Sequence, residues 1–552
     1  NLTIVPGEWL AIIGSNGSGK STLARQLNGL LLPKSGRVLV DGLDTADEKC
    51  LRKIRERVAF VFQNPDNQLI ATSVEDDIAF GPENLGLDPA EISRRVEQAL
   101  TITGLTEKRY KPPHLLSGGE KQRVAIAGAL AMASDYLILD EPTSMLDVRL
   151  RASVLATLEQ LHRELGLGLI YVTNLMEEAA LAERVIVLDQ GRLVKEGTPR
   201  EIFADSNWLE ERNLAMPQLC QLAAQLADAG YAHLRGCLNQ EELLQGLNSL
   251  HPVIDGECPE PLPDKFATKG EKQLWMDQVS YIYQQSSINA CQALNDVDLC
   301  IKKGELTAII GHGGSGKSTL ATLAAGLYLP TSGHVFLNGE EAAKESVFRQ
   351  AGLVFQYPEQ QLFGETVFEE VAFGPKNFGV AESWLPIKVR EALTDVGLLP
   401  ELFWHRSPFT LSGGQKRRVC IAGILATDPQ VMIFDEPSAG LDEGGRRWIM
   451  NLTTRLNQAG KTILWISHNM SEVAELADRL IVLAQGRIIA DGTPCQVFAQ
   501  ADALKRAGLE TPPIYQLCHN LRRLGWPLPE NIITVTEAKD ALLRILGGKG
   551  NV

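Results

Sequence analysis

The sequence lacks any uncharged apolar run approaching the roughly 18 residues that a membrane-spanning helix needs. It also lacks an excess of basic residues, because 53 Lys and Arg stand against 68 Asp and Glu and give a net charge of −15. Proteins that bind nucleic acid draw most of their affinity from a basic face, so this balance disfavours that class. We therefore expect a soluble protein that does not bind nucleic acid.

Paired cysteines are missing as well. The nine cysteines are scattered, with no CxxC pair and no Cys/His spacing typical of a metal site. We interpret them as small buried side chains in a reducing compartment. At 552 residues the chain is too long for one core, so several domains are expected. The first residue is not Met, and Asn1 is expected to lie partway into a domain whose upstream piece is missing.

What the sequence does contain is a glycine-rich stretch that occurs twice. GSNGSGKST and GHGGSGKST each follow a short apolar run and precede a helix-like stretch. In this context the glycines turn backbone N–H groups toward a phosphate, and the helix N-terminus adds its positive end. The lysine would bridge the β- and γ-phosphates of a nucleotide, and the serine after it would ligate Mg²⁺. The predicted nucleotide-binding residues of the two loops are Gly14, Ser15, Asn16, Gly17, Ser18, Gly19, Lys20, Ser21 and Thr22, and Gly311, His312, Gly313, Gly314, Ser315, Gly316, Lys317, Ser318 and Thr319.

The repetition extends over the whole chain. Motif residues recur 293 to 297 positions apart, and the stretch 214–230 matches 509–525. Each half is thus predicted to be an α/β domain that carries a small, mainly helical tail. The predicted boundaries are 1–203 and 273–498 for the domains, 204–250 and 499–552 for the tails, and 251–272 for a Pro-rich linker. Alternating segments at 36–41 and 333–338 indicate an antiparallel β element in each half.

Strands that end in polar residues supply the candidate catalytic groups. In each half one apolar strand ends in glutamine, whose amide can touch Mg²⁺ or the attacking water. Another, YLILD or VMIFD, is typical of a buried parallel strand and is followed by glutamate. The aspartate would hold Mg²⁺ through water, and the glutamate would orient and polarise the attacking water. These residues are Gln63, Asp140 and Glu141 in the first half and Gln356, Asp435 and Glu436 in the second; with Ser21 and Ser318, the glutamines and aspartates form the predicted Mg²⁺ ligands.

The stretches LLSGGEKQR (115–123) and TLSGGQKRR (410–418) place a serine and two glycines before a helix. Such a helix N-terminus binds anions, and its expected ligand is the γ-phosphate held by the opposite domain. With LSGG these stretches resemble the signature motif of ATP-binding-cassette (ABC) ATPases. The resemblance implies two tandem P-loop ABC domains, each with a mixed β core, an antiparallel β subdomain and a helical signature subdomain. The signature residues are Ser117, Gly118, Gly119, Glu120, Ser412, Gly413, Gly414 and Gln415, and SMLD (144–147) and AGLD (439–442) match the dimer-contact loop of the family.

One position departs from the family pattern. The switch histidine is His468 in the second half, but Asn174 stands there in the first half. Asn donates a hydrogen bond but carries no charge, and losing a charge-assisted contact of about 1.5–3 kcal/mol would slow the site about ten- to a hundredfold. The alternative is that Asn174 substitutes adequately, because both halves keep the glutamate. Tyr283 is a candidate to stack on adenine, with a core or edge aromatic as the alternative, and its first-half counterpart would precede Asn1.

A longer resemblance narrows the family. The stretches 62–87 (FQNPDNQLIATSVEDDIAFGPENLGL) and 355–380 (FQYPEQQLFGETVFEEVAFGPKNFGV) are similar to the ATPase subunits of energy-coupling-factor (ECF) importers, which take up vitamins and metal ions such as cobalt and nickel. The whole chain resembles two such subunits fused in tandem. This implies an ATPase that uses ATP and Mg²⁺ at the cytoplasmic face of the cell membrane. The implied partners are an integral membrane coupling subunit and a separate membrane substrate-binding subunit, and one fused chain per complex would supply both ATPase domains.

By the same resemblance, two ATP molecules would lie between the halves, and a groove beside each glutamine loop would receive a coupling helix. Acidic residues there would meet basic residues of the membrane subunit or form a solvated helix face; they are Asp76, Asp77, Glu369 and Glu370. The main rival function is a soluble tandem ABC ATPase acting on ribosomes or DNA. The short Pro-rich linker, the absence of zinc-binding cysteine sets and the acidic balance disfavour it. The glutamine-loop sequences also disfavour an ordinary ABC importer or exporter.

Overall fold

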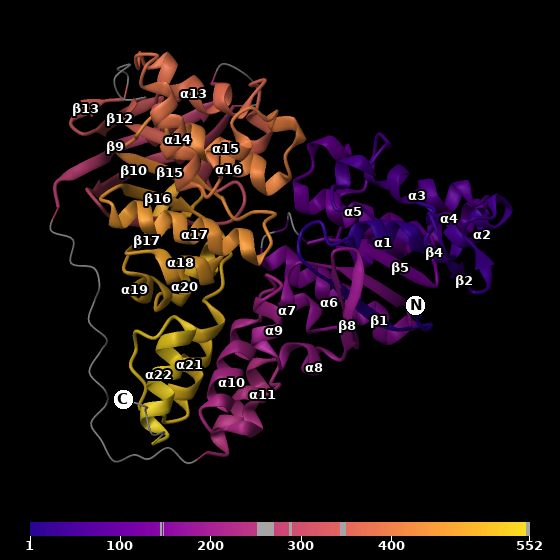
Figure 1. Ribbon diagram of the computed structural model, residues 1–552. Coiled ribbons are helices and arrows are strands. Elements are labelled where there is room, and N and C mark those ends of the chain that lie inside the picture. The colour runs from indigo at the N-terminus through magenta and orange to yellow at the C-terminus, as the bar shows by residue number, and fades with distance from the viewer. Residues whose placement is uncertain (144–145, 147, 251–269, 286–289, 343–348, 548–552) are drawn as a thin grey trace. The chain divides into compact units, whose positions relative to one another are not determined.

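The computed structural model describes residues 1–143, 146, 148–250, 270–285, 290–342 and 349–547. The chain forms two compact units, Asn1–Leu250 and His251–Val552, and each is described by itself (Figure 1). Most of the predicted linker lies outside the described residues. So do Ser144, Met145 and Asp147 of the first dimer-contact loop.

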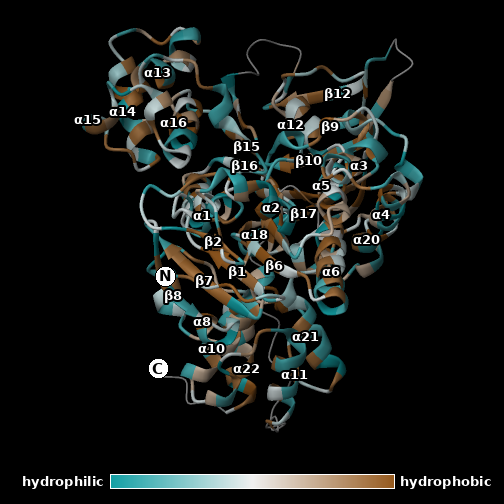
Figure 2. Cartoon of the chain, turned by 90° about the vertical axis from the view of Figure 1, so that its right-hand side faces the viewer, coloured by the Kyte–Doolittle hydropathy of each residue, from teal (hydrophilic) through white to brown (hydrophobic). Residues whose placement is uncertain are grey.

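A six-stranded sheet with the order β4-β5-β6-β1-β7-β8 is the centre of the first unit. Its strands are β4 (Val58–Val61), β5 (Tyr136–Asp140), β6 (Gly168–Val172), β1 (Trp9–Ile13), β7 (Arg184–Asp189) and β8 (Arg192–Gly197). The first five run parallel and β8 is antiparallel to β7. Every residue of β1, β4, β5 and β6 is buried, since helices cover both faces of a parallel sheet. Hydrophobic residues colour much of β7 brown in Figure 2.

Alternate residues of β1 enter two different cores. Trp9 and Ala11 pack in one cluster with Leu158, whereas Leu10 and Ile12 pack in another with Ala24. This division follows from the two-residue period of a strand. The covering helices are α1 (Lys20–Leu27), α2 (Glu48–Arg57), α6 (Val148–Leu165), α7 (Met176–Ala179) and α8 (Pro199–Phe203).

A helical subdomain with its own core lies between β4 and β5 in the chain. It contains α3 (Val74–Asn84), α4 (Pro89–Ile102) and α5 (Gly118–Ala131). Ile78, Leu100 and Val124 are buried together there, one from each helix. The predicted signature residues therefore begin a helix that is anchored in a separate small core.

The second unit repeats this architecture. Its sheet has the order β14-β15-β16-β11-β17-β18, formed by β14 (Ala351–Val354), β15 (Val431–Asp435), β16 (Thr462–Ile466), β11 (Leu306–Ile310), β17 (Arg479–Ala484) and β18 (Arg487–Gly492). Its helices are α12 (Lys317–Ala324), α13 (Val367–Asn377), α14 (Leu385–Asp395), α15 (Pro400–Phe403), α16 (Gly413–Leu425), α17 (Glu443–Gln458), α18 (Met470–Leu476) and α19 (Pro494–Phe498). The expected fold of two P-loop domains in tandem, each with a helical subdomain, is confirmed.

The antiparallel β elements differ between the units. In the second unit β10 (Cys291–Lys302), β9 (Lys272–Tyr283), β12 (Ser332–Leu337) and β13 (Glu340–Glu341) form a four-stranded sheet. In the described part of the first unit the corresponding sheet has two strands, β2 (Leu39–Val40) and β3 (Leu43–Asp44). The strand predicted at 36–41 is therefore reduced to two residues. Its counterpart β12 is longer because it pairs along β9 as well as with β13.

Each unit ends in a helical tail, as the repeat indicated. The tail helices are α9 (Ser206–Glu210), α10 (Gln218–Asp228) and α11 (Gln240–Asn248), and α20 (Ala501–Arg506), α21 (Pro513–Arg523) and α22 (Val535–Ile545). Leu209, Leu214 and Cys220 share a core cluster with Trp9 of β1. The first tail is thus packed into the core of its own ATPase domain. The domain and tail boundaries given above remain predictions.

Two expectations from the composition can be compared with the described residues. None of their helices combines the length and hydrophobicity needed to cross a lipid bilayer. The described cysteines are all free; Cys220, Cys237 and Cys518 are buried, whereas Cys291 is exposed. The interpretation of the cysteines as buried side chains therefore holds for only part of them.

Candidate functional site

The predicted site residues of each unit gather at one edge of its sheet. In the first unit β4, β5, β6 and β1 are neighbours, and because they run parallel their carboxyl ends meet at the same edge. Gln63, Glu141, Asn174 and the phosphate loop follow these four ends. The order in space differs from the order in the chain, since the switch strand β6 lies between β5 and β1.

Each phosphate loop turns sharply into its helix. Gly19 and Gly316 precede α1 and α12 with φ of 102° and 103°, a left-handed conformation that favours glycine. The amine of Lys20 donates to the carbonyls of Gly14 (2.7 Å) and Ser15 (3.1 Å). The second loop has the same pattern, with Lys317 bonded to the carbonyls of residues 311 and 312 at 2.9 Å. Each lysine is thereby tied to the backbone at the start of its own loop.

The residues beside the loops suit Mg²⁺. The hydroxyl of Ser21 donates to Asp140 at 2.9 Å, and Ser318 bonds to Asp435 in the second unit. Oδ1 of Asp435 is buried and has no hydrogen-bond partner among the described residues. One carboxylate, one hydroxyl and a nearby glutamine are oxygen donors of the kind that Mg²⁺ combines with water and phosphate. The described residues contain no cluster of three metal-ligating carboxylates, histidines or cysteines.

The predicted catalytic glutamate of the first unit, Glu141, accepts hydrogen bonds from two side-chain amides. Nε2 of Gln63 donates to one oxygen of Glu141 at 2.8 Å, and Nδ2 of Asn174 donates to the other. The same Nδ2 also lies 3.3 Å from Oδ1 of Asn16 in the phosphate loop. The neutral amide of Asn174 therefore links the loop to the glutamate through two hydrogen bonds.

In the second unit a histidine takes this place. Nε2 of Gln356 donates to Glu436 at 3.0 Å, and Nδ1 of His468 lies 3.4 Å from the same carboxylate oxygen. Gly313 stands where the first loop has Asn16, so the second loop has no side chain at this position. Both glutamates adopt positive φ, 49° at Glu141 and 48° at Glu436. This backbone costs on the order of 1–3 kcal/mol for a non-glycine residue and is typical of functional sites.

The two glutamates differ in acidity. Burial raises the pKa of Glu141, and the nearby charges of Asp140 and Glu178 add to this, while Lys20 opposes it. Burial also acts to raise the pKa of Glu436, but the hydrogen bond and charge of His468, with the charge of Lys317, outweigh it and lower the pKa. The ionised form that a general base needs is therefore better stabilised in the second unit.

The signature residues begin their helices with side-chain caps. Ser117 caps α5 and exchanges hydrogen bonds with Glu120, and Ser412 does the same at α16 with Gln415. Glu120 additionally forms an ion pair with Lys108. Both serines are exposed, so their hydroxyls and the helix N-termini are open to an anion.

Comparison with known proteins decides the family. Residues 1–144 and 294–439, more than half of the chain, match the family model described as ABC transporter. The chain belongs to the ABC transporter family. It is 37% identical over 98% of its length to a putative ABC transporter ATP-binding protein of Methanosarcina mazei, covering 93% of that protein. Over 94% of its length it is 37% identical to such a protein of Caldanaerobacter subterraneus subsp. tengcongensis, covering 92% of it.

A third relative matches a shorter part of the chain at higher sequence identity. Over 46% of its length the chain is 54% identical to the energy-coupling factor transporter ATP-binding protein EcfA1 of Symbiobacterium thermophilum, covering 88% of that protein. The predicted ABC ATPase is thus confirmed, and the chain is an ATP hydrolase of the ABC type in which two ATPase domains are joined in tandem. The roles of individual residues remain predictions.

Tyr283 lies beside the phosphate loop of the second ABC domain. Its hydroxyl is 3.1 Å from Oγ1 of Thr319, and its ring meets Tyr281 edge to face at 4.9 Å. The side chain is 37% exposed, so one part of the ring remains accessible. This placement is compatible with both predicted roles, an adenine platform and an edge aromatic.

Two kinds of buried residue beside the predicted sites were not predicted from the sequence. Arg417, 4% exposed, bonds to the backbone carbonyls of Gln356, Pro437 and Ala439 and to Glu359. Its first-unit counterpart is Gln122, whose Nε2 is buried without a hydrogen-bond partner among the described residues. The sequence did contain a signal for this difference, because the first signature stretch ends in QR and the second ends in RR.

The second kind is a buried glutamate four residues after each switch residue, Glu178 and Glu472. Its recurrence in both halves of the repeat could have pointed to it.

The acidity of the two glutamates gives a pH prediction. A general base acts only in its ionised form. When the pH is lowered, a glutamate with a raised pKa is protonated earlier, so its site loses activity at a higher pH. We expect the residual ATP turnover of Glu436→Gln, which depends on Glu141, to fall off at higher pH than the turnover of Glu141→Gln. The measurement is kcat against pH from the neutral into the acidic range for both variants. If kcat of the two variants fell off at the same pH, the predicted difference between the two glutamates would be contradicted.

Proposed function

We propose that the chain is the ATP-hydrolysing module of an ECF-type importer, and that it drives uptake of a vitamin or a transition-metal ion through membrane partner subunits. The observation that carries this proposal is the 54% identity to EcfA1, which extends over 46% of the chain. The glutamine-loop stretches 62–87 and 355–380 support it in both halves. Such a module works at the cytoplasmic face of the cell membrane, with a coupling subunit and a separate substrate-binding subunit in the membrane.

Within each unit the residues divide the work of hydrolysis. The lysine and the loop N–H groups hold the phosphates, and the glutamate accepts a proton from the attacking water that it orients. The glutamine and the switch residue keep the glutamate in place through the hydrogen bonds described above. Mg²⁺, held by Ser21 and Asp140 or by Ser318 and Asp435 together with the glutamine, would neutralise charge on the phosphates.

We further propose that each ATP is completed by the signature of the opposite half. The loop of the first half would work with Ser412 to Gln415, and that of the second half with Ser117 to Glu120. Binding then joins the halves because one ligand satisfies two anion sites, and hydrolysis lets them part. This opening and closing would be passed to the membrane subunits.

The two sites are proposed to be unequal. The second unit has His468 beside its glutamate, a lowered glutamate pKa and the buried Arg417 network. The first unit has the neutral Asn174 bridge and a glutamate whose pKa is raised. These differences support faster hydrolysis with Glu436 than with Glu141.

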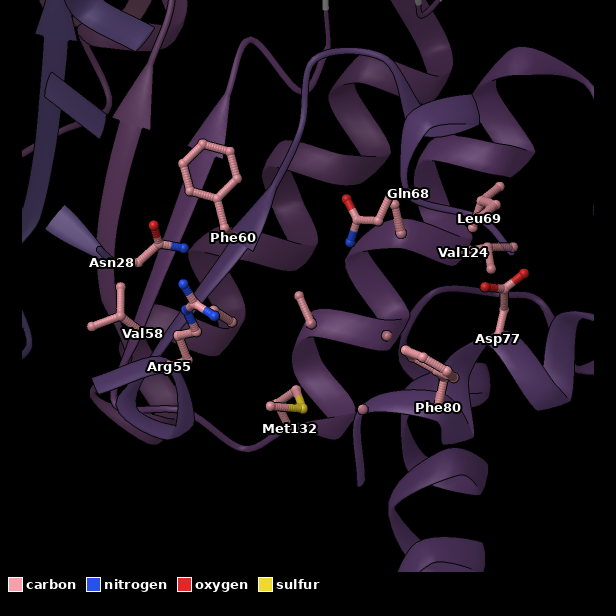
Figure 3. A pocket seen from close by; sticks show the side chains of 15 residues that line it. Asn28, Arg55, Val58, Phe60, Gln68, Leu69, Asp77, Phe80, Val124 and Met132 are labelled. Atoms are coloured by element: carbon pink, nitrogen blue, oxygen red, sulfur yellow. The ribbon is translucent and has the colours of Figure 1, made fainter. Parts of the chain in front are cut away.

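A cavity in the first unit suits the coupling helix of a membrane subunit. Its volume is about 240 Å³, and it lies between β4 and the helical subdomain. Figure 3 shows Val58 and Phe60 on one side and Asp77 and Phe80 on the other. Phe80 is 46% exposed, and Phe373, its counterpart in the second unit, is 47% exposed. An amphipathic helix would bury these rings in such a groove.

The acidic residues of the two glutamine-loop stretches have local partners. Asp77 accepts hydrogen bonds from the backbone N–H groups of Ile70 and Ala71, and Glu370 accepts from those of Phe363 and Gly364. These carboxylates close the loop that follows each glutamine. Ser73 and Thr366 cap the next helices; Asp76 accepts a hydrogen bond from the hydroxyl of Ser73, and Glu369 accepts one from the backbone N–H of Thr366. Contact with basic residues of a membrane subunit remains a prediction.

The groove can be tested by its aromatic residues. We expect the double variant Phe80→Asp/Phe373→Asp to recover at least about fivefold less membrane protein in affinity purification from detergent-solubilised membranes, since each ring is an apolar anchor of about 1 kcal/mol or more. Leu165→Asp/Leu524→Asp, at exposed leucines elsewhere, is the control. Recovery with ribosomes instead of membrane proteins would favour the soluble tandem ATPase.

A further inference from the structure

A buried glutamate that the hydrolysis scheme above does not use occupies the same place in both units. Glu178 in α7 is 2% exposed and Glu472 in α18 is 1% exposed. A buried carboxylate is costly unless hydrogen-bond donors surround it. Its presence at equivalent positions of both halves therefore requires a matching set of donors in each.

In the first unit the donors flank the catalytic residues. Oγ1 of Thr173 donates to Glu178 at 2.6 Å and accepts from the N–H of Leu175 at 2.9 Å. The hydroxyl thus closes a turn around the switch residue Asn174. On its other side Glu178 accepts a short hydrogen bond from Thr143, two residues after the catalytic glutamate.

The second unit repeats this arrangement. Oγ of Ser467 donates to Glu472 at 3.3 Å and accepts from the N–H of Asn469 at 3.0 Å, which closes the turn around His468. Oγ of Ser438, two residues after Glu436, donates to the same carboxylate at 2.9 Å. In each unit one buried carboxylate therefore holds the backbone both beside the switch residue and beside the glutamate that the switch residue contacts.

The helix that follows the dimer-contact loop contributes a cation in each unit. Nε of Arg151 in α6 lies 3.8 Å from Glu178. The charge of Arg446 in α17 acts on Glu472 in the same way. Each glutamate is thus the meeting point of the switch turn, the loop after the catalytic residue and the next long helix.

We propose that Glu178 and Glu472 are positioning residues for ATP hydrolysis. Each accepts hydrogen bonds from a hydroxyl next to the switch residue and from a hydroxyl near the catalytic glutamate, and thereby keeps these two residues in contact. The effect should be large because misplacing a catalytic group by about 1 Å can cost about 100-fold in rate. The proposal concerns the ATPase activity alone and does not rest on the ECF assignment. Neither residue touches ATP in this role.

The test removes both carboxylates from the full chain, so that its result does not depend on which unit turns over faster. We expect Glu178→Ala/Glu472→Ala to lower kcat about tenfold or more while KM for ATP stays within about twofold. Glu178→Gln/Glu472→Gln should recover part of the loss, because the amide oxygen still accepts from the hydroxyls. Glu177→Ala, at an exposed residue of α7 next to Glu178, should retain the parent kcat.

A second measurement separates positioning from mere stability. If Glu472 acts through His468, adding Glu472→Ala to His468→Ala should lower kcat by less than about twofold further. Full additivity of the two losses would overturn the proposal, as would parent kcat in a folded Glu178→Ala/Glu472→Ala variant. Should that variant fail to fold in a thermal unfolding experiment, Ser467→Ala decides. It removes one donor and is expected to lower kcat about threefold with KM unchanged, and parent kcat would overturn the proposal.

Discussion

Glu436→Gln is expected to abolish most steady-state ATP hydrolysis, with a loss of roughly ten- to a hundredfold that is limited by the slower site of Glu141. Glutamine keeps the size of the side chain but cannot accept the proton of the attacking water. The loss is large because Glu436 is the glutamate whose ionised form is stabilised, by His468 and Lys317. Its neighbours Gln356 and Arg417 are also fixed by direct hydrogen bonds.

Glu141→Gln, the matched variant of the first unit, should reduce turnover much less. Asn174 offers Glu141 a neutral amide, and burial raises the pKa of that carboxyl. The measurement is steady-state phosphate release at saturating ATP for the parent chain and both variants. Equal losses would reject unequal sites and favour the alternative that Asn174 substitutes adequately for histidine.

Two double variants that share one substitution are expected to differ by roughly 100-fold in turnover. Lys20→Ala/Ser412→Arg damages the same proposed composite site twice and leaves Lys317, Glu436 and Ser117 together. Lys20→Ala/Ser117→Arg damages both sites. Both serines are exposed, so arginine changes the anion-binding helix N-terminus without entering a core.

The reference for this pair is Lys20→Ala alone. We expect Lys20→Ala/Ser412→Arg to hydrolyse ATP at the rate of Lys20→Ala, and Lys20→Ala/Ser117→Arg to be far slower than Lys20→Ala. If each site were instead completed by the signature of its own half, the order of the two variants would be reversed. ATP-dependent closure, followed by the distance between labels on the two units, should respond in the same order.

The fold and the nature of the chemistry followed from local patterns. WLAII, YLILD and VMIFD are fully buried strands, and both GKST stretches begin helices at a phosphate loop. The tails were predicted from the repeat alone. The segment 36–41 was less predictable, because the extent of a strand depends on the neighbour with which it pairs.

By itself, the sequence determined that this protein carries two phosphate loops, two signature helices and two pairs of adjacent acidic residues at strand ends, which are predicted to be catalytic, since each is a short stretch whose spacing fixes its local geometry. Only the tertiary structure decided which groups touch. Asn174 lies beside Asn16, 158 positions away in the chain, because β6 is inserted between β5 and β1. The acidity of the glutamates and the burial of Glu178 likewise come from segments that the sheet order brings together, and no local pattern specifies that order.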